Sequence, residues 1–194
     1  SEMCIRDSTE VAPSTVDLLL PSGAENLNYV LYTDESPYKM QREWLDRLPF
    51  DIYSVNVHTG AKRLIGRSYR TAPKWSVNGK WAVMYDPIAQ VWNKFDGATG
   101  KVVNISDAIG YPMFVESYDK PAPAPAYGIA GWTADGNNVF LYDAYDWWKI
   151  DLTGERQPEC LTKGYGRKHG KSIRKMTSNI DKDVFQKDEK VIVS

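Results

Sequence analysis

Short runs of aromatic and β-branched residues recur along the chain and are bounded by Gly, Asp, Asn or Pro, as strands of antiparallel sheets are. These runs are residues 28–32, 51–57, 81–85 and 139–142. Helical periodicity is weak except in one segment, residues 38–48, where apolar side chains follow helical spacing. Those side chains are Met40, Trp44, Leu45 and Leu48. The pattern predicts an all-β fold with a short helical insertion near 38–48.

One supersecondary unit, a strand followed by Thr-Gly and a second strand, repeats along the chain. It spans residues 51–65, 91–105 and 147–162. Each Thr-Gly predicts a hairpin, because glycine adopts the positive φ that tight turns demand. The hairpin glycines are Gly60, Gly100 and Gly154.

A second element precedes the last two hairpins and places a Trp before an Asn-Gly or Asp-Gly turn. It comprises Trp75 with Asn78-Gly79, and Trp132 with Asp135-Gly136. Together the two elements predict a four-stranded unit, the composition of a β-propeller blade. A β-sandwich or barrel also uses short strands and glycine turns, but rarely repeats one unit with its turn chemistry. We therefore expect an incomplete propeller of roughly three blades.

The repeat also divides the chain into expected pieces. Blade pieces are expected at about 9–66, 71–106 and 127–163, and the start of a further blade at 172–194. Residues 111–127 are an expected insertion, in which alternating prolines from Pro121 to Pro125 favour an extended surface strap.

The first eight residues resemble a translated sequencing-adapter end, so we exclude residues 1–8 from fold reasoning as an expected artefact. This leaves Cys160 as the one cysteine, which cannot form an internal disulfide and carries no information on the redox compartment. We expect both natural termini to lie outside this stretch.

The composition of the chain points to no particular class of function. The 194 residues are 42% hydrophobic, enough to bury a core, and 24 Lys and Arg balance 25 Asp and Glu. No net charge therefore favours nucleic acid or an anionic membrane, and no apolar run approaches the roughly 20 residues of a membrane span.

Several longer strings resemble the N-terminal propeller of large bacterial serine peptidases of the prolyl oligopeptidase family, the type common in Bacteroidetes. They are residues 75–80, 128–133, 142–151 and 164–168. The resemblance implies a downstream α/β-hydrolase domain with a Ser-Asp-His triad on a G-x-S-x-G elbow, a peptide substrate, and a periplasmic or extracellular location. The strings nearest to an elbow, residues 66–70 and 170–174, lack its final Gly.

By this resemblance the chain has no catalytic residue of its own and no cofactor, and it gates peptide access to an absent hydrolase domain. The alternative, from a different functional class, is a propeller without an enzyme that serves as a binding or scaffold module. A hydrolase domain in the same reading frame separates the two.

Candidate ligand contacts are few. Glu116, Tyr118 and Asp119 lie in the insertion, where recognition residues on a rigid scaffold tend to sit, although an ordinary polar loop is favoured. His58 and His169 have no second ligand at metal spacing, so turn and loop roles are expected.

A basic cluster lies near the end of the chain, without the aromatic platform of a nucleic-acid site, and we expect a solvated connection between blades. It consists of Lys163, Arg167, Lys168, Lys171, Arg174 and Lys175. The Gly-Lys-Ser at 170–172 is not a phosphate loop, because Tyr165 stands where that motif needs Gly. The abundant Trp and Tyr are expected in the core.

Overall fold

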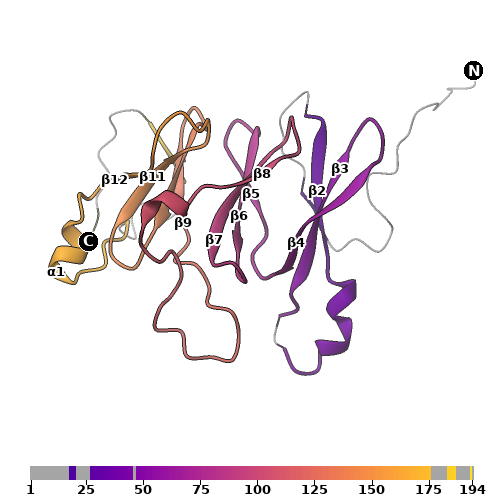
Figure 1. Ribbon diagram of the computed structural model, residues 1–194, viewed down its shortest axis with the longest axis horizontal. Coiled ribbons are helices and arrows are strands. Elements are labelled where there is room, and N and C mark those ends of the chain that lie inside the picture. Colours follow the sequence, from indigo (N-terminus) through magenta and orange to yellow (C-terminus); the bar gives the residue numbers. More distant parts are fainter. Residues whose placement is uncertain (1–17, 21–26, 46, 176–182, 187–192, 194) are drawn as a thin grey trace, which may run out of the picture.

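The computed structural model describes residues 18–20, 27–45, 47–175, 183–186 and 193 (Figure 1). This part of the chain is mostly β-structure, which confirms the all-β prediction. Its strands form three sheets that lie side by side along the longest axis of the molecule (Figure 1). Within each sheet, strands that follow one another in sequence are antiparallel neighbours, except the last strand of the third sheet, which pairs in parallel with the first strand of that sheet.

The first sheet has the order β1-β2-β3-β4. Its strands are β1 (Leu18–Leu20), β2 (Tyr29–Asp34), β3 (Phe50–Asn56) and β4 (Lys62–Tyr69). Between β2 and β3 the chain forms a 3-10 helix, η1 (Ser36–Gln41). In β3 the alternation of inward and outward side chains is interrupted by register shifts at Ile52 against β4.

The second sheet has the order β5-β6-β7-β8. Its strands are β5 (Lys74–Trp75), β6 (Trp81–Asp86), β7 (Val91–Asp96) and β8 (Val102–Asn104). A single 3-10 turn, η2 (Asp107–Ile109), follows β8 and leads into the 111–127 segment.

The third sheet repeats this arrangement and adds one strand. It contains β9 (Ile129–Thr133), β10 (Asn138–Tyr142), β11 (Trp147–Asp151) and β12 (Glu159–Cys160). The short helix α1 (Tyr165–His169) follows, and β13 (Val184–Phe185) pairs in parallel with the free edge of β9. In the described part of residues 172–194 the chain thus joins the third sheet, and a further blade there stays a prediction.

The predicted hairpin turns are confirmed. Gly60, Gly100 and Gly154 have φ values of 69°, 71° and 84°, in the left-handed region that glycine adopts without strain. The carboxylate of Asp96 accepts hydrogen bonds from the amides of Ala98 and Thr99 at 2.8 and 3.2 Å, and so closes the turn as an Asx motif.

Two apolar clusters hold the three sheets together. Between the first and second sheets, Leu31, Ile52 and Tyr69 pack against Ala82, Met84 and Phe95. Between the second and third sheets, Val83 and Trp92 belong to one buried cluster with Trp132, Leu141 and Trp148. The first and third sheets therefore each bury one face on the second sheet, which buries both of its faces because alternate side chains point to opposite faces.

The helical insertion is corrected by the structure. The helix is of the 3-10 type and ends at Gln41, and Met40 and Trp44 are 92% and 83% exposed. Of the apolar side chains in the predicted stripe, Leu48 alone is buried. The insertion projects beyond the ends of the strands (Figure 1), so no second layer covers it, and an apolar stripe forms a stable helix face only when something packs on it.

Candidate functional site

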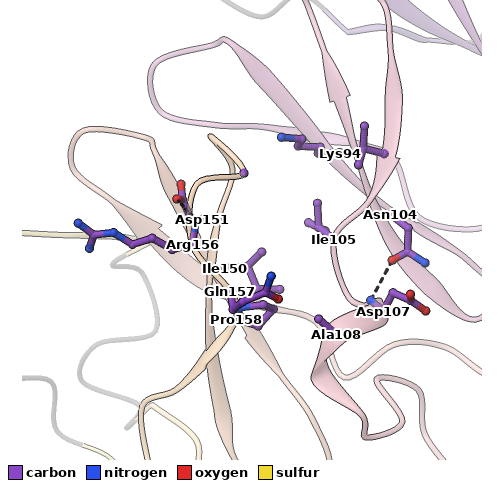
Figure 2. A pocket seen from close by; sticks show the side chains of 12 residues that line it. Lys94, Asn104, Ile105, Asp107, Ala108, Ile150, Asp151, Arg156, Gln157 and Pro158 are labelled. Carbon is purple, nitrogen blue, oxygen red and sulfur yellow. Dashed lines mark hydrogen bonds between the residues drawn. The ribbon is translucent and has the colours of Figure 1, made fainter.

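A groove of about 270 Å³ lies between the second and third sheets (Figure 2). Lys94 from β7 and Asn104 from β8 line one wall, and Ile150 and Asp151 from β11 line the other. Pro158, just before β12, lies on the β11 side of the groove (Figure 2). The groove exists because the face-to-face packing of the two sheets leaves their outer strands apart.

The polar groups of the groove are largely engaged by the protein itself. The Lys94 ammonium donates to the carbonyl of Leu152 in the neighbouring sheet. Asp151 accepts hydrogen bonds from the amides of Thr153 and Arg156, at 2.9 and 3.1 Å. Burial opposes ionisation of Asp151, but these bonds and that of the Thr153 hydroxyl outweigh it and lower the pKa of the carboxyl.

Two charged side chains that line the groove are exposed. Asp107, the first residue of η2, and Arg156, after β11, are exposed on its two sides. The residues that line the groove include no Ser, Thr, Cys or His. The groove can therefore hold a polar or charged segment.

A second hollow, of about 420 Å³, lies beside α1 and is walled by Tyr111, Trp148 and Arg167. Under it, Asp143 is fully buried, and its Oδ2 accepts a hydrogen bond from the Arg167 guanidinium at 3.0 Å and another from the Trp148 indole at 3.0 Å. Burial raises the pKa of the Asp143 carboxyl, but donors that include the Asp146 amide outweigh that effect and lower it.

The Asp146 carboxylate accepts hydrogen bonds from residues at and before the start of α1. Its carboxylate accepts bonds from the Thr162 hydroxyl at 2.5 Å and from the amides of Gly166 and Arg167 at 2.9 and 3.0 Å. The two acids thus attach α1 to the β10–β11 turn. The hydrogen bonds of both carboxylates therefore hold this part of the fold together.

The basic cluster is not the solvated connection that its composition predicts, because two of its arginines are structural. Arg174 donates to the carbonyl of Asp143 at 2.8 Å, and its guanidinium lies 4.6 Å from the centre of the Tyr142 ring. Arg167 lies 4.0 Å from the centre of the Tyr111 ring. Burial lowers the pKa of Arg174. Lys163, Lys168 and Lys171 are exposed, as the sequence predicts.

The three candidate residues of the insertion do not form a common site. Tyr118 lines a small pocket of about 70 Å³ with Arg70, Tyr85 and two prolines of the strap, whereas Glu116 and Asp119 are exposed. The strap is attached more closely than its sequence suggests. Residue Ala126 forms an antiparallel bridge with Phe114, and the Tyr85 hydroxyl donates to the carbonyl of Ala124 at 3.0 Å.

The histidines take local roles. The His58 ring nitrogen lies 3.1 Å from the Asn28 side-chain oxygen, and the His169 ring packs 4.3 Å from that of Tyr165. Within the described ranges no group of three His, Cys, Asp or Glu side chains could hold a metal ion. No helix in the described part of the chain is long and apolar enough to cross a membrane.

Neither string that resembles a nucleophile elbow forms one. Ser68 has a φ of 56°, but it lies in strand β4, and its amide donates to Asp51 with no imidazole nearby. The Ser172 hydroxyl donates to the carbonyl of Ala144 at 2.9 Å. Both serines have structural partners, and the strand-to-helix turn of an elbow is absent from both places.

Sequence reasoning missed two acids at the ends of strands, the fully buried Asp143 and the half-buried Asp86. Asp143 follows β10 as Asp86 ends β6, and each accepts bonds from amides two and three residues onward. The recurring Tyr-Asp pair, Tyr85-Asp86 and Tyr142-Asp143, is the signal that could have identified them. No family model matches the chain, and a search of curated proteins finds none that matches it.

Proposed function

We propose that this chain is part of a β-propeller, and that each of its three sheets is one blade. The observation that carries the proposal is the stacking of successive sheets that share one strand order. Each sheet contains four antiparallel strands in sequence order, to which the third sheet adds β13, and the buried clusters lie between adjacent sheets. Radial repetition of such a unit is the propeller architecture.

We further propose that the parent protein is a serine peptidase of the prolyl oligopeptidase family. The support is the resemblance of residues 142–151 and 164–168, among others, to such propellers. Residues of these two segments form the hydrogen bonds of Asp143 and Asp146. The resemblance therefore covers residues whose side chains have specific buried partners. In this role the propeller restricts access of peptides to a hydrolase domain, and the chain itself does not cleave them.

The test is to sequence the source DNA beyond both ends of the reading frame and to express the extended protein. A G-x-S-x-G elbow followed by Asp and His, together with peptide hydrolysis that is lost when the elbow Ser is replaced by Ala, supports the proposal. An extended frame without a hydrolase domain contradicts the peptidase and leaves a binding or scaffold propeller. An extended frame whose added segments do not repeat the four-stranded unit contradicts the propeller.

A further inference from the structure

The third sheet carries an added strand that differs from the other strands of the three sheets. β13 pairs with β9 in parallel, whereas the other strand pairs are antiparallel. The Trp132 amide donates to the carbonyl of Asp183 at 2.7 Å, and the Ala134 amide donates to the carbonyl of Phe185 at 2.9 Å. These two donors belong to the edge of β9 that faces away from β10. The segment Asp183–Gln186 therefore occupies a sheet edge, the usual place for strand addition.

A single side chain anchors this segment. Phe185 is 5% exposed, and its ring centre lies 5.7 Å from that of Phe140 and 6.5 Å from that of Trp147. Gly131 of β9 makes the recess possible, because a Cβ there would stand 2.4 Å from a ring carbon of Phe185. The edge of β9 and this aromatic recess together form what we call the β9 cleft.

We propose that the β9 cleft is a binding site for an extended peptide that carries an aromatic side chain, and that residues 183–186 occupy it as an internal ligand. Main-chain bonds at alternate residues combined with one side-chain pocket define peptide recognition by strand addition. The cleft presents the Trp132 and Ala134 amides, with Gly131 just before Trp132 and the aromatic recess beside that glycine.

The hold of the internal segment is limited, which makes exchange feasible. Its described contacts include two ladder bonds, the Phe185 anchor and an ion pair of 3.0 Å between Lys175 and Asp183, of which the Asp183 side chain is 63% exposed. β13 is only two residues long and lies at a sheet edge, and short edge strands open locally at a small fraction of the global unfolding free energy. An incoming peptide thus competes with a tethered segment, not with the core.

The chemistry of the ligand follows from the same contacts. It has an aromatic residue with its carbonyl free to accept from Ala134, a second acceptor carbonyl two residues earlier, and an acidic side chain at that earlier position for Lys175. It lies parallel to β9. This inference does not depend on the proposed peptidase, because it rests on the pairing of β9 alone.

The test is an NMR titration of the isotope-labelled full chain with an end-capped synthetic peptide of the sequence of residues 182–187. Phe185→Ala should bind the peptide about tenfold or more tightly than the wild type, because the tethered competitor is weakened. The shifts should centre on the Trp132 and Ala134 amides and the Trp147 indole. A peptide with Ala in place of Phe should cause none of them at the same concentration.

Two further variants make the result specific. Tyr165→Ala removes an aromatic side chain that is 55% exposed in the same part of the sequence, and it should keep the wild-type affinity. Gly131→Ala in the Phe185→Ala background places a methyl group in the recess and should abolish binding. Equal affinity of wild type and Phe185→Ala, or binding that survives Gly131→Ala, overturns the proposal.

A measurement on the wild type covers the case in which Phe185→Ala does not fold. Amide hydrogen exchange at Trp132 and Ala134 should be at least about tenfold faster than in β10, the central strand, because the edge opens locally. Added peptide should leave the β10 rates unchanged. If the two edge amides exchange only at the β10 rate, residues 183–186 are an integral part of the core and the β9 cleft does not exchange its occupant.

Discussion

Asn78, in the turn between β5 and β6, donates a hydrogen bond of 2.9 Å from its side-chain amide to the carbonyl of Asp135, in the turn between β9 and β10. The same amide lies 3.3 Å from the Asn137 side-chain oxygen. These are the equivalent turns of two successive sheets. The contact therefore sets the relative position of neighbouring repeats at a point where the apolar cluster between them has ended.

Gly136 tests this contact. A Cβ on Gly136 would stand 2.6 Å from the backbone nitrogen of Asn78. A Cβ on Gly110, at nearly the same φ of +71°, would meet nothing within 4 Å. Gly110→Ala should cost about 1 kcal/mol for the left-handed backbone alone. Gly136→Ala should cost about 1–3 kcal/mol more, from overpacking. Urea unfolding of both variants measures the difference, and equal losses would show that the turns separate freely.

Arg167 should be worth far more to stability than its sequence neighbour Lys168. Replacing Arg167 with Met leaves the fully buried Asp143 carboxylate without its charged partner, at a cost of about 3 kcal/mol. Lys168→Met, on the exposed side of α1, should stay within about 0.5 kcal/mol of the wild type. The free energies of unfolding in urea decide between this and a solvated role for both residues, for which the two variants would behave alike.

Tyr85 should make the protein sensitive to alkaline pH. Burial, with a smaller contribution from Asp86, raises the pKa of its hydroxyl from 10.0 to about 12. Because the unfolded chain loses this proton first, the stability that it contributes is complete below pH 10 and is lost as the pH rises toward 12. Tyr85→Phe should lose less stability than the wild type between about pH 9 and about pH 11.

The control for Tyr85 is Tyr165→Phe, which alters a side chain that is 55% exposed. It should show the wild-type loss of stability over the same pH interval. If Tyr85→Phe shows that loss as well, the Tyr85 hydroxyl is not held protonated by its surroundings, and the attachment of the strap through Ala124 has no effect on titration.

Substitutions in the insertion between β2 and β3 distinguish the burial seen in the structure from the burial that the predicted helix requires. Trp44→Ser should change the free energy of unfolding by less than about 0.5 kcal/mol, because the indole is 83% exposed. Leu48→Ala, at a side chain that is 8% exposed, should cost about 2–3 kcal/mol. A large loss for Trp44→Ser would instead indicate that the indole packs as the helical periodicity suggests.

The four-stranded repeat and its turns were predictable because the information is local, whereas the parallel pairing of β13 with β9 was not. Gly79 and Gly136 take φ values of 67° and 69° wherever the rest of the chain lies, since Asn-Gly and Asp-Gly favour such turns by themselves. The candidate site was predictable only in part. Tyr118 lies in a pocket while its neighbours Glu116 and Asp119 do not, and nothing in the order of these residues distinguishes them.

By itself, the sequence determined the all-β class, the repeat of the four-stranded unit and the turns within it, because alternation and turn chemistry act over a few residues. Tertiary structure decided that Arg167 pairs with Asp143, 24 positions away, and that Phe185 enters the recess beside Gly131. Both contacts depend on which segments meet in space. Burial then sets how much a charged or aromatic side chain contributes to stability, and the local sequence pattern does not show which side chains are buried.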